Sequence, residues 1–241
     1  MSNETLSWFD YIGDDQTQAG LTQNGYACYK GQNILPAGNK EMYNPIYYKA
    51  DQFTLDEAKS GFAFLSDDGT QKAYGGDYKA CTWAYLTDDN GVSFIYVNVH
   101  LNRKPSQSEL DEGAENYQDD VVGYFKVLLV DLAEQYACPI IIGGDFNASY
   151  SVLKGYDSYW GDTAVSVKDE ATNTTTGCST TTTDFSDLGS ASGAIDLYFA
   201  LNAENVDFHS YAVTDNKVEE TGKYPSDHLP IIMVATIYGE N

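Results

Sequence analysis

Basic residues are scarce in this 241-residue chain, which carries 13 Lys and Arg residues against 36 Asp and Glu residues, for a formal net charge of −23. Arg103 is its only arginine. Such a charge repels polyanions at long range, and few basic residues are present to hold a phosphate backbone. We therefore expect no strong non-specific nucleic-acid binding. Carboxylates that collect divalent cations fit this balance better.

Long apolar runs are also missing. No stretch reaches the roughly 18 uncharged apolar residues of a membrane-spanning helix. Residues 1–16 contain neither the basic nor the apolar region of a signal peptide. The richness in Tyr, Thr, Asn and Asp nevertheless resembles secreted bacterial proteins. We expect a chain without a membrane span, and favour an extracellular location over a cytoplasmic one.

Paired cysteine motifs are absent as well. The four cysteines show no C-x-x-C spacing, which argues against a zinc site. Cys81 and Cys138 lie in apolar, strand-like segments and are expected to be buried thiols. Cys28 and Cys178 lie in loop-like segments, and a disulfide between them is left open.

Strand patterns begin after residue 42. The predicted strands are residues 43–50, 80–88, 92–101, 139–147, 194–201, 206–214 and 229–237. Asn90 and Gly91 form a strong hairpin signal, so the strands on either side of them are expected to pair antiparallel. The uninterrupted β-branched run in 139–147 indicates a strand that is buried on both faces.

One long helix is predicted between these strands. Ser106 and Glu109 form a capping box, and apolar residues then repeat at helical spacing until the helix ends near Tyr136. Residues 148–193 are rich in loop signals, and their Thr/Ser tract is expected to form a surface loop beside a site. The order of strands, helix and strands predicts an α+β fold in one domain spanning residues 1–241.

Polar side chains gather at several predicted strand ends. Asn98 and His100 share one face of their strand, and Asp145 and Asn147 share one face at the end of theirs. Asp196 interrupts the apolar run of a third strand. Buried charges are costly unless they are paired or bound to metal. Each residue has an ordinary explanation when taken alone, but their recurrence at strand ends indicates one common site.

The segment "YPSDHLPIIMV" carries a further acid and imidazole. Asp227 and His228 directly precede the last predicted strand. Pro230 forces Leu229 into an extended conformation. The strand therefore fixes how this pair of polar residues is presented.

Four of these segments together resemble a known family. "NVHL", "GGDFN", "AIDLYFA" and "YPSDHLP" occur in the order seen in the endonuclease/exonuclease/phosphatase superfamily of DNase-I-like hydrolases. "KEMYNPIYYKADQFTL" and "KACTWAYL" are similar to its bacterial members, so the match covers roughly residues 39–237. The resemblance implies a four-layer α/β sandwich of two packed mixed β-sheets flanked by helices. It also implies hydrolysis of a phosphate ester that depends on Mg²⁺, Mn²⁺ or Ca²⁺.

The resemblance implies a role at each matching position. Asp145 and Asn147 would bind the phosphate and a metal or the attacking water, and Asp227 would be a metal ligand. His228 would be the catalytic histidine, oriented by Asp196. A histidine held in this way by a carboxylate has a fixed tautomer and serves as a general base or as an electrostatic clamp.

Further positions follow from the same resemblance. His100 would contact the phosphate and would be held by Glu41. Lys79 stands where many relatives have an arginine, and Asn98 stands beside His100, so both are expected to bind substrate. Tyr43 would shape the pocket. His209 has no motif around it and is expected to be structural.

The resemblance to the family begins only near residue 39. The family's first strands, one ending in Asn and one in Gln-Glu, are not recognised in the sequence, and that Glu helps to hold the principal metal. The chain is expected to be a fragment of a larger protein, a shortened and impaired member, or a subunit whose partner supplies the strand, and we favour the first. A chain lacking two strands would expose a sheet edge and would tend to pair or swap.

The substrate is a phosphorylated compound that the sequence does not identify. The alternative to an enzyme is a non-catalytic domain that binds a phosphorylated or other ligand. A membrane-active phospholipase is disfavoured because basic or aromatic insertion segments are lacking.

Overall fold

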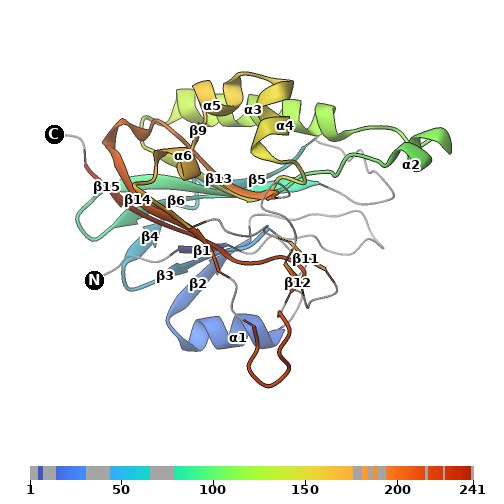
Figure 1. Ribbon diagram of the computed structural model, residues 1–241. Coiled ribbons are helices and arrows are strands. Elements are labelled where there is room, and N and C mark those ends of the chain that lie inside the picture. Colours follow the sequence, from blue (N-terminus) through green and yellow to red (C-terminus); the bar gives the residue numbers. More distant parts are fainter. Residues whose placement is uncertain are drawn as a thin grey trace.

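A computed structural model describes residues 5–7, 15–30, 44–65, 79–175, 181–183, 187–188, 194–214, 217–224 and 226–239. Its elements lie in four layers (Figure 1). Helices α3 (Gln118–Gln135), α4 (Tyr150–Tyr156) and α5 (Tyr159–Asp162) cover one face of a seven-stranded sheet. Smaller sheets pack on its other face, and helix α1 (Asp15–Gln23) lies beyond them.

The seven-stranded sheet is mixed and carries the predicted site residues Asn98, His100, Asp145 and Asp196. Its order is β4-β6-β7-β8-β13-β9, with β5 also paired to β6. The strands are β4 (Phe53–Leu55), β5 (Gly61–Phe64), β6 (Ala80–Asp88), β7 (Ser93–His100), β8 (Ile140–Asp145), β9 (Val165–Ser166) and β13 (Asp196–Leu201). Strands β7 and β8 are parallel, whereas β13 runs antiparallel to β8.

The second layer of strands is divided into smaller sheets. One has the order β10-β14-β15 and another the order β1-β3-β2, and β11 pairs with β12. These strands are β1 (Thr5–Ser7), β2 (Tyr26–Tyr29), β3 (Ile46–Lys49), β10 (Asn173–Thr175), β11 (Thr182–Thr183), β12 (Asp187–Leu188), β14 (Val206–Val213) and β15 (Ile231–Ile237). The short helices are α2 (Gln107–Asp111), α6 (Val167–Glu170) and the 3₁₀ turn η2 (Ala203–Asn205). The predicted α+β class, with mixed sheets flanked by helices, is confirmed.

Two hydrophobic cores hold these layers together. Ile140 and Ile142 of β8 pack in the core under the helices, whereas Ile141 packs in the core shared with the second layer of strands. All six residues of β8 are buried, so the prediction of a strand buried on both faces is confirmed. Burial of each of the three isoleucine side chains stabilises the fold by about 1.5–3 kcal/mol. Strand β8 is therefore a rigid support for its last residue, Asp145.

The strand predictions agree with β3, β6, β7, β8, β13, β14 and β15, and the antiparallel pairing of β6 with β7 is also confirmed. The single long helix is wrong. Ser106 and Glu109 do form a capping box, but it starts the short helix α2, and Gly113 follows in a left-handed conformation with φ +94°. A glycine with positive φ interrupts helical geometry, so α3 begins separately at Gln118.

Several elements were not predicted. Helix α1 and strands β1, β2, β4 and β5 lie in segments of weak periodicity or short length. Residues 148–193, read as loop-rich, contain α4, α5, β9 and α6, and the Thr/Ser tract read as a surface loop contributes the short strands β10, β11 and β12. Cys28 is a free thiol, which argues against a disulfide with Cys178, a residue outside the described part of the chain. Cys81 is buried as predicted, whereas Cys138 is half-buried.

The membrane prediction concerns helices alone. None of the helices in the described ranges is long and apolar enough to cross a bilayer.

The two glycines before Asp145 allow a close approach of neighbouring strands. A Cβ on Gly144 would lie 2.0 Å from the carbonyl oxygen of Val99, which is backbone on β7. A Cβ on Gly143 would lie 2.5 Å from the hydroxyl oxygen of Tyr96 and from a ring carbon of Tyr198. Side chains at either position would push the neighbouring strands away, so the glycines maintain the spacing of β7, β8 and β13.

Gly144→Ala is expected to lower the free energy of unfolding by about 3 kcal/mol or more, because the added methyl group meets backbone that has no room to move. Gly123→Ala is the matched control, since no atom lies within 4 Å of a Cβ on Gly123 in α3. This control should stabilise the protein by about 0.5–1 kcal/mol. Urea denaturation measures both values. Equal stability of the two variants would contradict the close contact between β8 and β7.

Candidate active site

Three predicted site residues form a row across the seven-stranded sheet. The strand register pairs His100 of β7 with Asp145 of β8, and Asp145 with Asp196 of β13. Neighbouring residues on one face of a sheet have Cβ atoms about 5 Å apart. The Nε2 atom of His100 lies 3.3 Å from Oδ2 of Asp145. Residues far apart in the sequence thus meet at one end of the sheet.

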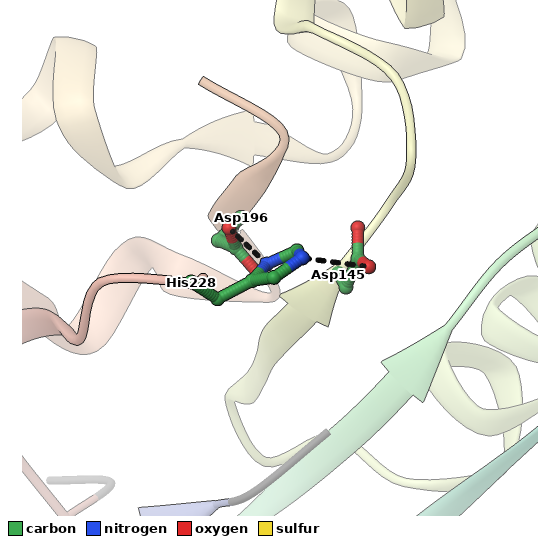
Figure 2. A group of neighbouring side chains, drawn as sticks. All are labelled: Asp145, Asp196 and His228. Carbon is green, nitrogen blue, oxygen red and sulfur yellow. Dashed lines mark hydrogen bonds and ion pairs between the residues drawn. The ribbon is translucent and has the colours of Figure 1, made fainter. Parts of the chain in front are cut away.

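His228 completes this group from the loop before β15. Its Nδ1 atom lies 3.1 Å and 3.0 Å from the two carboxylate oxygens of Asp196. Its Nε2 atom lies 4.0 Å from Oδ2 of Asp145. Figure 2 shows the imidazole ring between the two carboxylates. The hydrogen bond to Asp196 places a proton on Nδ1, so Nε2 is the atom that faces Asp145.

Burial controls the charges in this group. The exposed fraction is 5% for Asp145 and 0% for Asp196. Burial and the negative charge of Asp196 raise the pKa of Asp145 to about 7. The hydrogen bond to Asp196 and the charges of the surrounding carboxylates raise the pKa of His228 to about 9. At neutral pH the group therefore holds an imidazolium between two acidic side chains.

This pKa makes the stability of the protein pH-dependent. The ordinary pKa of histidine is 6.5 and that of His228 is about 9, so protonated His228 stabilises the folded state. The contribution is fully present below pH 6.5 and is lost as pH rises through 9. Between pH 7.5 and 9.5 the free energy of unfolding of the wild type is expected to fall by about 2 kcal/mol more than that of His228→Gln.

Urea denaturation of both proteins at the two pH values measures this difference. Titrating groups away from this site are common to the two proteins and cancel in the comparison, so the measured difference belongs to His228 together with the carboxylates coupled to it. Parallel pH dependences would contradict the strong pairing of His228 with Asp196.

Asn147 supports the carboxylate of Asp145. Its backbone N–H donates to Oδ1 of Asp145 at 2.7 Å, and its side-chain Nδ2 donates to Oδ2 at 3.2 Å. The same Nδ2 also donates to the carbonyl of Leu101 at 2.9 Å. Asn147 has φ +48°, a left-handed conformation that asparagine adopts more readily than most residues. Its amide nitrogen therefore holds the neighbouring acid in place.

Lys79 and Asn98 occupy different surroundings. The Nζ atom of Lys79 lies 3.1 Å from Nε2 of His100, so a lysine and a histidine stand together beside Asp145. Asn98 is completely buried, and its Nδ2 donates to the carbonyl of Pro45 at 3.0 Å. The structure thus places Lys79 at the site and Asn98 in the interior, where it supports the segment before β3.

Asp227 is exposed, unlike the buried Asp145 and Asp196. Its Oδ1 accepts a hydrogen bond from Ser226 Oγ at 3.4 Å, and its negative charge helps to raise the pKa of His228. Glu41 and Tyr43 fall outside the described residues. The exposed His209 bonds Thr236 on the neighbouring strand β15, with its Nε2 2.8 Å from the Thr236 hydroxyl oxygen.

Thr181 is a neighbour of the site that the sequence did not reveal. Its backbone forms an antiparallel bridge with the backbone of His228. It belongs to the Thr/Ser tract, where every residue has a similar local pattern. Only the pairing in three dimensions distinguishes Thr181 from the threonines around it.

The central group has the chemistry of a cation site. Asp145, Asp196 and His228 each offer one ligand atom, and these atoms lie within 4.8 Å of one another. Carboxylate oxygens suit Mg²⁺ and Mn²⁺, and imidazole nitrogen suits transition metals. Both oxygens of Asp196 contact the positively charged ring of His228, whereas those of Asp145 accept from the neutral amide groups of Asn147, so Asp145 has the carboxylate better placed to bind an ion.

Comparisons with known proteins bear on the fold. The sequence matches no protein-family model and no curated protein. The structure is similar to a mannosyl-6-phosphatase from Bacteroides thetaiotaomicron, with a TM-score of 0.69 and 18% identity over 88% of this chain and 78% of that chain. It is similar to an endonuclease/exonuclease/phosphatase from Bacteroides vulgatus, with a TM-score of 0.73 and 18% identity over 98% and 85% of the two chains. The human Nocturnin catalytic domain with bound sulfate has a TM-score of 0.65 and 15% identity over 97% of this chain and 80% of that chain.

Proposed function

Because the chain has the fold of the endonuclease/exonuclease/phosphatase proteins, we propose that it hydrolyses a phosphate ester with the help of a divalent metal ion. One observation carries this proposal. His228 is held between the buried carboxylates of Asp196 and Asp145, at the sheet end that also carries His100 and Lys79. Two similar structures are a mannosyl-6-phosphatase and a domain that holds a sulfate anion, which supports a phosphorylated substrate.

The donor set fits a divalent cation. Burial and the charge of Asp196 raise the pKa of Asp145 to about 7 even beside the His228 ring, so a bound cation would favour the ionised form of Asp145. We propose Asp145 as a ligand, with Asp227 as a second carboxylate from the loop that carries His228. Mg²⁺ or Mn²⁺ in this place would neutralise the charge that develops on the phosphate and would activate water.

The side chains of the chain itself have distinct proposed roles. Asp196 fixes the His228 ring through Nδ1 and leaves Nε2 to face the reacting group. As an imidazolium, His228 stabilises negative charge on the phosphate, and as a neutral ring it accepts a proton from the attacking water. Lys79 and His100 contact phosphate oxygens on the other side of Asp145.

The remaining roles rest on the sequence resemblance. Glu41 is proposed to orient His100, and Tyr43 to shape the pocket. Asn147 is proposed to act near the phosphate while it holds Asp145.

The test uses two chromogenic esters, bis(p-nitrophenyl) phosphate as a diester and p-nitrophenyl phosphate as a monoester. Purified protein is assayed with Mg²⁺, with Mn²⁺ and with EDTA, beside Asp145→Asn. We expect release of p-nitrophenolate from at least one ester, dependent on metal and abolished by EDTA. If wild type and variant were equally inert while a similar solved phosphatase was active, the alternative of a non-catalytic ligand-binding domain would replace this proposal.

A further inference from the structure

The side chain of Gln118, at the start of α3, joins the two loops that follow β7 and β8. Its Nε2 donates to the carbonyl of Asn102 at 2.9 Å and to the carbonyl of Asn147 at 2.9 Å. Its Oε1 accepts a hydrogen bond from the hydroxyl of Tyr156 at 2.7 Å. The exposed fraction of Gln118 is 1%. One buried amide therefore connects α3, α4 and both loops.

These two loops directly follow two of the proposed site residues, His100 at the end of β7 and Asp145 at the end of β8. Asn102 lies two residues after His100, and Asn147 lies two residues after Asp145. Asn147 holds both carboxylate oxygens of Asp145 and also bonds the carbonyl of Leu101. The backbone N–H of Leu101 donates to the carbonyl of Asp145 at 2.9 Å. Gln118 is therefore linked to the Asp145 carboxylate through one intervening residue.

The chemistry of these contacts requires an amide. Both loop partners are carbonyl oxygens, so they need N–H donors, which a glutamate would not supply. Tyr156 directs the oxygen of the amide toward itself, which turns Nε2 toward the loops. Burial and the charge of Asp119 raise the pKa of Tyr156 to about 12, so its hydroxyl keeps the donated proton at working pH.

We propose that Gln118 is a positioning residue that sets the separation of His100 and Asp145 by tying together the loops behind them. Loss of the Gln118 amide would take a hydrogen-bond donor from each of the two loop carbonyls, which costs free energy. A change at Gln118 is therefore expected to lower the stability of the protein as well as to alter the geometry of the site. The kinetic consequence rests on the proposed phosphoesterase function, whereas the effect on site geometry does not.

The kinetic test replaces Gln118 with methionine, which keeps the chain length and removes both donors. We expect kcat per folded molecule to fall by about 10–100-fold, as for outer partners of metal-site residues, with a smaller change in KM. The kcat of Gln118→Glu should fall by at least the same factor. The kcat of Tyr156→Phe should fall by a smaller factor, because the Nε2 atom of Gln118 remains available to the two carbonyls.

Two controls separate positioning from stability. Gln135→Met makes the same substitution at the other end of α3, where the exposed Gln135 donates to the hydroxyl of Tyr136, and should leave kcat unchanged. Leu132→Ala empties a buried position of α3 and should lower Tm without lowering kcat per folded molecule. If Gln118→Met, like Leu132→Ala, lowered Tm but left kcat per folded molecule unchanged, Gln118 would be structural and the inference would be wrong.

A second readout does not depend on turnover. The chain has three histidines, so the imidazole Cε1–H signals are resolvable by NMR, and the exposed His209 serves as an internal reference. Gln118→Met should shift the signals of His100 and His228 but not that of His209. Shifted signals in a protein whose wild type hydrolyses no ester would sink the proposed function and keep the positioning role. Signals identical to those of Gln135→Met would overturn the positioning role itself.

Discussion

Replacing Asp145 with asparagine is expected to lower kcat/KM for metal-dependent ester hydrolysis by about 10³-fold or more. The substitution keeps the volume of the side chain but removes the buried charge that would bind the cation. It also keeps only one of the two acceptor oxygens, so one of the two donors of Asn147 retains its partner and the other faces an NH2 group. Binding of Mn²⁺, followed by titration calorimetry, should weaken in parallel.

The same variant should not be less stable at pH 8. Burial raises the pKa of Asp145 from 3.8 to about 7, so its ionised form destabilises the folded state, and this penalty is complete only above pH 7. Asparagine removes the penalty, and thermal unfolding at pH 8 should occur at an equal or higher temperature. Asp207→Asn, at an exposed position of β14, is the control and should retain full activity. Loss of folding in Asp145→Asn would contradict this separation of stability from activity.

Replacing His228 with glutamine is expected to lower kcat by about 10²–10⁴-fold. Glutamine retains hydrogen-bonding capacity, but it neither carries the positive charge nor exchanges the proton that the pairing with Asp196 prepares. In steady-state kinetics across pH 6–10, the variant should also lack the pH dependence of kcat that reports the His228 pKa of about 9. His209→Gln alters an exposed histidine on β14 and should behave as the wild type. A His228→Gln variant within about tenfold of wild type would show that the imidazole takes no part in proton transfer or charge stabilisation.

The sequence predicted the strands that carry the site, because β7, β8, β13 and β15 have uninterrupted or alternating apolar patterns. It did not predict that His100, Asp145 and Asp196 form one row. That row depends on the register of three strands separated by long stretches of chain, and no local pattern encodes it. The apolar pattern predicts each strand separately, and only the assembled sheet brings the ends of these strands side by side.

The acidic neighbours of His228 show what the family resemblance added to the local pattern. Asp227 is next to His228 in the sequence, but the resemblance assigned the contact with the ring to Asp196, and the structure has that contact while the side chain of Asp227 is exposed. Successive residues in an extended segment point in different directions, so adjacency in a motif does not establish contact.

Gln118 escaped the sequence analysis for a different reason. Its position at the start of α3 became clear only after Gly113 was found to end α2, which separated two segments read as one helix. Its acceptors are backbone carbonyls, and these carry no sequence signal at all.

The most direct test of the central claim is the position of ¹⁸O after hydrolysis in H₂¹⁸O. The reaction uses whichever p-nitrophenyl ester the purified protein cleaves with Mg²⁺ or Mn²⁺. Attack of water on phosphorus, prepared by His228 and Asp196 beside Asp145, predicts that the label enters the phosphate product and that incorporation disappears with EDTA and in Asp145→Asn. Label in the nitrophenol, or incorporation that survives the loss of Asp145, would contradict a metal-dependent phosphoesterase centre at this site.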